Sequence, residues 1–594
     1  MTRYKLGWMF LLLAQLGWVG CGPNDGPGGE CSDGSAEDVG RCMITFWRPP
    51  GAREPGDGVR RAGLPPAMNR PETDIEPRLK ILSTRPAAGE SGVLPAAIIT
   101  VTLSESLSPE TVSASTFLLE KDGVPVAGRV SVSSNVARFE PAAPLVPGGR
   151  YTATLLRGIE SVLGGVLEET RSWAFIVREA QWGRTGVVLQ DKPIGGAGEP
   201  QVAMDAKGQA VTLWTQHNVD RDEIWFSRHA PGSGWSAGAA LDSSLAGSSG
   251  EPRLGLRADG HALAIWSHFN EVHYAIWFSE QAPGEPWSRA RSLLPEPFGD
   301  ASNPHLAMDP ATGTAFAVWL QFDGFRETVW SARHLPGQGW DQLRQLDDGS
   351  WEDSALPRIA VNANGAAVAV WTQAGGSVGT LWARHYGPDS GWGPAQRIDP
   401  VSTFDTQMPD VALSSTGEAL AVWLQWEKGL YVTYSGHFLP GHGWGKARRI
   451  DAELPGHASG PRIALDPRGN AIAIWSRFDG AAESILTNRY SVGFGWDTAR
   501  FLEGEEGTAR APRLAIDGAG NAAAVWQQEV DGHIRVRSSR YVAAVGWGLC
   551  SVVSPEVIGD ATEPALALGP GEQGMAVWRQ TLTEEGTIVA NRYQ

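Results

Sequence analysis

The sequence predicts an all-β protein, in which a small β-sandwich is followed by an eight-bladed β-propeller that an N-terminal outer strand closes. Three observations lead to this prediction. A unit of about 52 residues recurs eight times between residue 198 and the C-terminus. The unit shows no 3.6-residue periodicity, so helical repeats are excluded. The eighth copy lacks its last strand, and a matching segment precedes the first copy.

Residues 1–20 have the features of a signal peptide. Arg3 and Lys5 precede an apolar run from Leu6 to Val19, which is short for a membrane span. The run leads to Cys21 and resembles a bacterial lipobox, although Trp18 stands where a Leu is usual. The resemblance implies export and lipidation of Cys21, and the Gly at position 22 favours the outer membrane. Ordinary cleavage that leaves a free Cys21 thiol remains the alternative.

Residues 21–77 are rich in Gly, Pro, Asp and Ser, which predicts a flexible tether. With Cys21 lipidated, Cys31 and Cys42 would be able to form a disulfide there in an oxidising compartment. Cys550 would be a buried, inert thiol. No Cys-x-x-Cys is present, so no metal site and no cofactor is expected. The formal net charge of −17 argues against a nucleic-acid partner.

Residues 78–178 alternate between apolar and polar side chains over short stretches, which predicts the β-sandwich. The segments are 98–103, 129–132 and 151–155. The motifs Ser83–Gly89, Thr102–Val112 and Ser172–Phe175 resemble bacterial Ig-like domains of the S-layer (SbsA-like) type. The resemblance implies a stalk or spacer. Tyr151 follows a Leu-x-Pro-Gly turn and fits a tyrosine corner, in which the phenol ties down a strand crossing.

Each of the eight units between residues 180 and 594 is expected to form one four-stranded blade. In the fourth unit the strands are expected at 357–361, 366–371, around 380–383 and at 391–398. The units open with Pro200, Pro252, Pro304, Pro357, Pro409, Pro461, Pro512 and Pro564. The eighth unit ends at Gln594 before its Gly-Trp strand, and residues 181–190 supply the equivalent. We therefore expect 181–190 to pair with 588–592 and close the ring.

Two kinds of repeated residue have structural explanations. An Asp with a Gly three or four positions later, as at Asp205, Asp309, Asp466 and Asp517, is typical of a tight turn. A metal site is the alternative for these residues. A Trp ends the alternating run in every unit, and another follows a Gly in most units. Such Trp residues are expected to fill the space between blades, with sugar stacking as the alternative.

The loops on one face of the ring differ more between units than the turns on the other face, which is typical of a ligand-binding face or of simple drift. The residue after each opening proline should line that mouth of the central channel. It is Arg253, His305, Arg358, Arg462 or Arg513 in five units. These side chains are candidate anion ligands. The sequence favours the alternative that Asp300, Asp353, Asp405 and Asp560 neutralise them.

The sequence therefore predicts a surface-anchored, non-enzymatic binding or adhesion lipoprotein with a glycan or protein ligand at the cell surface. The lipid anchor would be its sole contact with the membrane. A structural envelope component and a glycan-processing enzyme are the alternatives. No catalytic residues are assigned, because the sialidase Asp-box, Gly-x-Ser-x-Gly and His-Glu-x-x-His are all absent. His268, Glu271, His273 and Tyr274 come closest to a catalytic group, and a solvated loop explains them better.

Overall fold

The computed structural model describes residues 78–593, apart from the stretches 94–96, 143–144, 147, 179–180, 191–194, 295–298, 348–351, 376–377, 401–404, 452–453, 504–506, 544, 555–558, 570–572 and 582–584. Within these residues the protein is all-β, and one 3₁₀ turn, η1 (Pro109–Thr111), is its sole helical element. No helix in the described part is long and apolar enough to cross a membrane. The signal peptide, Cys21 and the Cys31–Cys42 pair lie outside the described residues.

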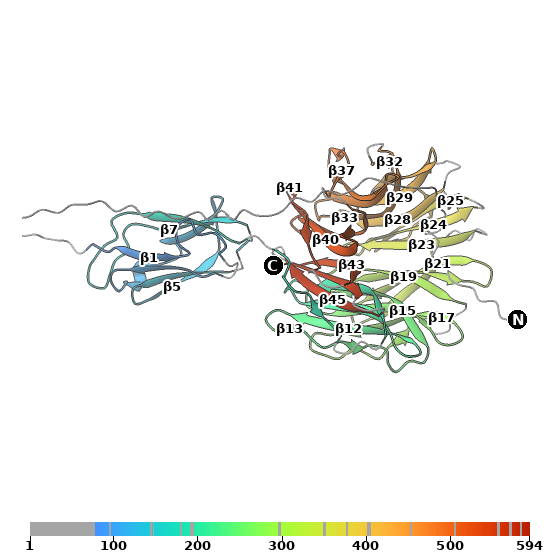
Figure 1. Cartoon of the computed structure of the whole chain (residues 1–594), viewed down its shortest axis with the longest axis horizontal. Coiled ribbons are helices and arrows are strands. Elements are labelled where there is room, and N and C mark those ends of the chain that lie inside the picture. The colour runs from blue at the N-terminus through green and yellow to red at the C-terminus, as the bar shows by residue number, and fades with distance from the viewer. Residues whose placement is uncertain are drawn as a thin grey trace, which may run out of the picture. The chain divides into compact units, whose positions relative to one another are not determined.

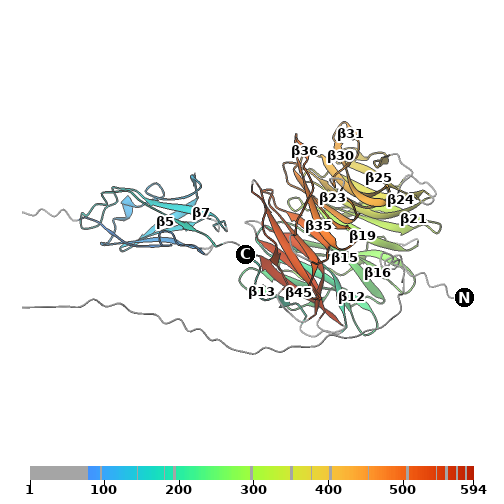
Figure 2. The same cartoon turned by 45° about the horizontal axis from the view of Figure 1, so that its top comes forward.

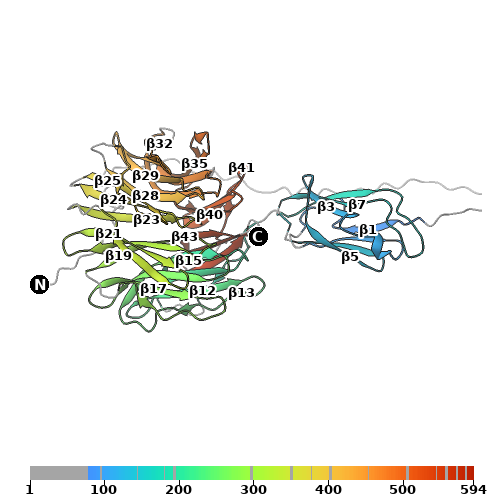
Figure 3. The same ribbon diagram turned by 180° about the vertical axis from the view of Figure 1, so that it is seen from behind.

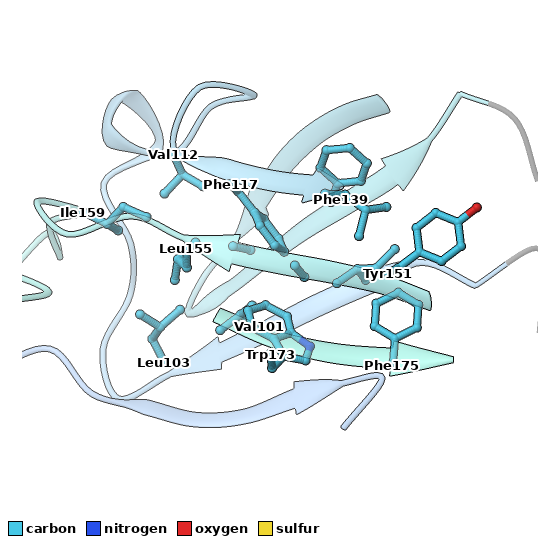
Figure 4. Close-up of a cluster of buried hydrophobic side chains, with 14 of the residues drawn as sticks. Val101, Leu103, Val112, Phe117, Phe139, Tyr151, Leu155, Ile159, Trp173 and Phe175 are labelled. Atoms are coloured by element: carbon cyan, nitrogen blue, oxygen red, sulfur yellow. The ribbon is translucent and has the colours of Figure 1, made fainter. Parts of the chain in front are cut away.

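The first folded part is a sandwich of two four-stranded antiparallel sheets. One sheet has the order β1 (Ile81–Arg85), β2 (Ile99–Leu103), β6 (Val136–Pro141), β5 (Gly128–Ser133). The other has the order β4 (Val124–Pro125), β3 (Phe117–Lys121), β7 (Arg150–Leu155), β8 (Arg171–Ile176). Phe117, Phe139 and Trp173 lie between the sheets (Figure 4).

The tyrosine corner predicted at Tyr151 is present. The Val146 backbone N–H donates to the Tyr151 hydroxyl at 2.7 Å, and the ring stacks on Phe175 with centroids 5.8 Å apart. This contact fixes the loop before β7 against the strand itself. The expected strands at 98–103, 129–132 and 151–155 are confirmed to within one or two residues as β2, β5 and β7.

The second folded part consists, in the described residues, of eight antiparallel sheets, numbered here first to eighth in chain order. Their innermost strands are β10 (Ala197–Met204), β15 (Ser248–Leu256), β19 (Ala301–Met308), β23 (Asp353–Val361), β28 (Thr406–Leu413), β33 (His457–Leu465), β38 (Ala509–Ile516) and β43 (Asp560–Leu568). The second strands are β11 (Ala210–His217), β16 (Ala262–Phe269), β20 (Ala315–Phe322), β24 (Ala367–Gly375), β29 (Ala419–Glu427), β34 (Ala471–Phe478), β39 (Ala522–Val530) and β44 (Gly574–Thr581). The second strands are nearly continuous runs of small, β-branched and aromatic residues and are buried on both faces, as in Ala315–Phe322.

The third strands are β12 (Asp222–Ala230), β17 (Tyr274–Gln281), β21 (Glu327–Leu335), β25 (Val378–Gly387), β30 (Leu430–Leu439), β35 (Glu483–Ser491), β40 (His533–Val542) and β45 (Gly586–Tyr593). Most fourth strands are broken into two short pieces, as in β13 (Gly234–Trp235) with β14 (Ala239–Ala240), β26 (Gly391–Trp392) with β27 (Gln396–Arg397), β31 (Gly443–Trp444) with β32 (Arg448–Arg449), β36 (Gly495–Trp496) with β37 (Arg500–Phe501), and β41 (Gly546–Trp547) with β42 (Ser551–Val552). The second and third sheets have the single fourth strands β18 (Arg291–Ser292) and β22 (Gly339–Gln345).

The eight sheets form a closed ring. Each innermost strand contacts the innermost strand of the next sheet, and β43 contacts β10. Figure 1 shows the sheets following one another from green through yellow to red. Seen from behind in Figure 3, the innermost strands β15, β19, β23 and β28 lie side by side.

The two ends of the ring are joined by hydrogen bonds. Strand β9 (Val187–Val188) pairs with β45 as the fourth strand of the eighth sheet, with Val188 opposite Val589. Trp182 is buried and donates from Nε1 to the Ser538 hydroxyl at 2.7 Å. The pairing of 181–190 with 588–592 that the sequence predicts is therefore present. In Figure 2 the last strands, in red, lie next to the first, in green.

The space between sheets is filled by Trp, as predicted. All eight Trp residues that end the alternating run are 0% exposed, namely Trp214, Trp266, Trp319, Trp371, Trp423, Trp475, Trp526 and Trp578. Side chains of the third strands also contact the third strand of the next sheet. Arg333 donates to the Tyr386 hydroxyl, and Arg540 lies over the Tyr593 ring at 5.1 Å. Each partner stands 53 residues further along the chain, one sheet away.

Loss of β9 should weaken the ring. A chain beginning at residue 198 lacks both β9 and Trp182, whereas one beginning at 178 keeps them. Burial of a single Trp contributes about 3–5 kcal/mol, so we expect the shorter chain to aggregate or to melt many degrees below the longer one. Thermal unfolding followed by circular dichroism measures this difference. Equal melting temperatures would contradict closure by β9.

Candidate functional site

Four arginines face the centre of the ring and make the same local contact. Each directly follows the opening proline of its sheet and donates from Nη1 to the carbonyl of that proline, at 2.9–3.2 Å. Their side chains are half-buried. These residues, called here the central arginine group, are Arg253, Arg358, Arg462 and Arg513.

No described residue forms an ion pair with the central arginine group. The aspartates expected to neutralise it instead accept backbone N–H groups from the third strand of the preceding sheet. Asp353 accepts from Glu327, Asp405 from Gly379 and Asp560 from Ile534, at 2.7–2.9 Å. Asp300 does the same for Tyr274. Internal pairing with these aspartates, which the sequence favours, is therefore wrong, because their carboxylates connect neighbouring sheets.

The four guanidinium groups repel one another across the ring. Burial, followed by the charges of Arg462, Arg253 and Arg358, lowers the pKa of Arg513 to about 9. Burial and Arg462 lower the pKa of Arg358 to about 10, with Asp410 acting in the opposite direction. Both groups are still charged at neutral pH. The fold therefore holds several cations close together. The charges of Glu251 and Glu199 act on Arg253, and that of Asp410 acts on Arg358 and Arg513, without forming ion pairs. An anion bound among them would relieve this repulsion.

His305 adds an uncharged donor to the same place. Burial, with the charges of Arg358 and Arg253, holds the pKa of its imidazole well below the ordinary value. The ring is therefore neutral at neutral pH. Its Nδ1 accepts the Ile359 backbone N–H at 3.3 Å, which leaves the proton on Nε2. His305 thus offers an N–H to a ligand without adding charge.

Three glutamates that the sequence analysis did not single out lie beside this group. Each directly precedes an opening proline, and its carboxylate accepts the backbone N–H of the equivalent residue in the next sheet. Glu563 accepts from Glu199 at 2.7 Å, Glu199 from Glu251 at 2.8 Å, and Glu251 from Asn303 at 2.8 Å. We call this the glutamate ladder. The Glu-Pro step in three of the eight units was the sequence signal.

All eight residues before the opening prolines have a left-handed backbone, with φ between 50° and 56°. Seven of them are not glycine, namely Glu199, Glu251, Asn303, Leu356, Met408, Ala511 and Glu563. The register against the second strand shifts at this point in every sheet, as in a β-bulge. A bulge accommodates a proline, which has no backbone N–H to donate to the neighbouring strand. Strain of this kind typically gathers at functional sites.

The other residues considered from the sequence do not form a site. His268 is buried, with Nδ1 2.8 Å from the Ser249 hydroxyl, whereas Glu271 lies on an exposed turn. The repeated aspartates hold turns, since Asp205 Oδ1 accepts the N–H groups of Lys207 and Gln209 at 2.8 Å. The turn interpretation is thereby confirmed. The half-buried Cys550 packs against the core between the sixth and seventh sheets.

Comparison with known families identifies one part of the chain. Residues 75–177 match the family model of a bacterial Ig-like domain. This confirms the Ig-like sandwich, while the narrower likeness to the S-layer type stays a prediction. No curated protein matches the chain.

Several solved structures are similar at low identity. A protein of unknown function from Dyadobacter fermentans is 12% identical and covers 70% of this chain and 98% of its own, with a TM-score of 0.35. An ulvan lyase is 9% identical and covers 69% and 95%, with a TM-score of 0.41. The leech intramolecular trans-sialidase is 11% identical and covers 88% and 92%, with a TM-score of 0.31.

These comparisons correct the function expected from the sequence. A non-enzymatic binding or adhesion protein was preferred, but the similar structures include polysaccharide lyases, sialidases and an arabinofuranosidase. The preference for a non-enzymatic adhesin is thus contradicted. At these identities the likeness says nothing about the substrate of this chain.

Replacing part of the central arginine group should not destabilise the ring. In the double variant Arg358→Ala/Arg462→Ala we expect a melting temperature equal to or above that of the wild type, because two mutually repelling cations are removed. Sulfate, compared with chloride at equal ionic strength, should stabilise the wild type more than this variant. The exposed pair Arg289→Ala/Arg448→Ala is the matched control and should respond to sulfate as the wild type does. A marked loss of stability in the first variant would indicate internal ion pairs instead.

Proposed function

We propose that the ring is an eight-bladed β-propeller that cleaves an acidic polysaccharide at its centre. The observation that supports this proposal most directly is the central arginine group, whose four cations have no ion-pair partner among the described residues. Guanidinium groups bind carboxylate and sulfate oxygens in a two-pronged geometry. A polysaccharide whose sugars carry such groups would place one carboxylate or sulfate at a time among the arginines.

The same place also holds groups that can transfer protons. The carboxyl of Glu251 is surrounded by protein, and burial raises its pKa above the ordinary value for Glu. A raised carboxyl pKa beside a substrate-binding group is a common feature of enzyme active sites. His305 supplies a neutral donor among the same arginines. Binding and proton transfer are therefore available within one small region, which a purely structural ring would not require.

The location of the protein is a separate part of the proposal. We propose that it is exported, lipid-anchored at Cys21 and retained at the outer membrane, with residues 21–77 as the tether. The charged start and apolar run of the first twenty residues support export. The bacterial Ig-like domain of residues 75–177 would act as a spacer between the anchor and the propeller. A glycan of the cell surroundings would be the partner.

Cleavage is tested with a panel of acidic polysaccharides, both uronate-rich and sulfated, and with neutral ones as controls. We expect new reducing ends from at least one acidic substrate and none from the neutral ones. Arg358→Ala/Arg462→Ala should raise KM for that substrate at least tenfold, whereas Arg289→Ala/Arg448→Ala should leave it unchanged. Raising the salt concentration should also raise KM in the wild type, since salt screens the guanidinium charges. A panel that stays intact would refute the proposal.

Lipidation is tested by detergent phase separation of the full-length protein. The wild type should enter the detergent phase. The Cys21→Ala variant should remain in the aqueous phase or accumulate as an unprocessed precursor, because it has no thiol to receive the lipid. Partition of the wild type into the aqueous phase would show that the anchor is absent.

A further inference from the structure

The second sheet differs from the other seven in one respect. It alone has a glutamate before its opening proline and an arginine after it, in the sequence Glu251-Pro252-Arg253. The first and eighth sheets carry Glu-Pro followed by Gln201 and Ala565, and the fourth, sixth and seventh carry arginine without the glutamate. The glutamate ladder and the central arginine group therefore meet on β15.

The contacts of Glu251 hold one oxygen and leave the other available. Its Oε2 accepts the Asn303 N–H at 2.8 Å, and its own backbone N–H donates to Glu199 at 2.8 Å. No hydrogen bond to Oε1 occurs among the described residues. The carboxyl is thus oriented by the ladder while one oxygen remains free to exchange a proton.

Three neighbours act on the Glu251 charge besides burial. The Asn303 N–H and then Arg253, on the same strand as Glu251, lower the Glu251 pKa, and the like charge of Glu199 on β10 raises it. Glu251 in turn raises the pKa of the Tyr274 phenol on β17, after burial and Asp300. His305 on β19 is neutral, as described above. Burial is the largest influence on Glu251, and the resulting pKa lies above the ordinary value.

We propose that Glu251 is the catalytic base of a β-elimination on a uronate whose carboxylate is bound by Arg253. This deepens the proposed function and rests on it. Glu251 takes the proton from the carbon next to the uronate carboxylate, and the C–H electron pair forms a carbon–carbon double bond. The bond from the neighbouring carbon to the glycosidic oxygen breaks, and that oxygen receives the proton from Glu251. No water and no oxidant is consumed.

The charge of the site favours elimination over hydrolysis. Removal of the proton sends negative charge into the uronate carboxylate, where guanidinium groups stabilise it. Glycoside hydrolysis passes through a transition state with positive charge on the sugar ring, which four nearby guanidinium groups would destabilise. The same cations therefore assist one reaction and oppose the other.

Isosteric variants of the ladder separate the catalytic role from the structural one. Glu251→Gln keeps an oxygen that can accept the Asn303 N–H but cannot take a proton, so we expect kcat to fall at least about 100-fold with KM and the melting temperature unchanged. Glu563→Gln alters a residue with the same ladder contact in the eighth sheet, which has no arginine. It should leave the melting temperature unchanged. Glu285→Gln, at an exposed position in the loop after β17, should keep kcat within about twofold. The product is followed by the ultraviolet absorbance of the unsaturated uronate and, independently, by reducing ends.

The pH profile gives a second readout. Glu251 must be ionised to act as a base, so wild-type activity should fall as the pH drops through the raised pKa of Glu251. Glu199→Gln removes the like charge, lowers that pKa and should move the acidic limb to lower pH. Cleavage without unsaturated product, or full activity of Glu251→Gln, would overturn the elimination while the proposed function stands. Absence of cleavage by the wild type would overturn both.

Discussion

The ring is organised around the inner edges of its eight innermost strands. Each such strand pairs with a partner on one side only, because it stands first in its sheet, so backbone N–H groups on the other side face the centre. Buried donors of this kind must find acceptors. Glu563, Glu199 and Glu251 satisfy three of them, and the imidazole of His305 satisfies a fourth. Asp410 accepts a fifth, from Ile463 at 3.0 Å.

This use of acceptors determines the electrostatics of the centre. The nearby carboxylates of Glu199, Glu251 and Asp410 accept backbone N–H groups. They act on the arginines through their charge but form no ion pair with them. The aspartates at the start of the innermost strands are also engaged, since they connect neighbouring sheets. Four guanidinium groups are consequently brought together without an ion-pair partner among the described residues. The proposed acidic substrate, the neutral state of His305 and the preference for elimination all follow from this arrangement of charge.

The residue pattern alone was sufficient to predict the role of a residue where that residue type has one dominant structural use. The spacing of the opening prolines predicted eight sheets, and the Trp that ends each alternating run was correctly assigned to the core, where Trp214 and its seven equivalents are fully buried. Tyr151 and the Asp205 turn were predicted from local motifs, and their hydrogen bonds are present. For Tyr151 and Asp205 the hydrogen-bond partner lies within five residues in the chain. Local spacing then carries the information.

The sequence by itself determined the all-β class, the Ig-like sandwich, the repeat and the residues that face the centre. Only the tertiary structure decided what those residues contact. Asp353 stands five residues before Arg358 yet accepts a hydrogen bond from Glu327 in the preceding sheet, and Glu251 contacts Asn303, which is 52 residues away. Such partners are set by how neighbouring sheets stack around the ring. A charge four or five residues distant along a strand carries no information about the sheet beside it, so neutralisation of the arginines could not be judged from the chain alone.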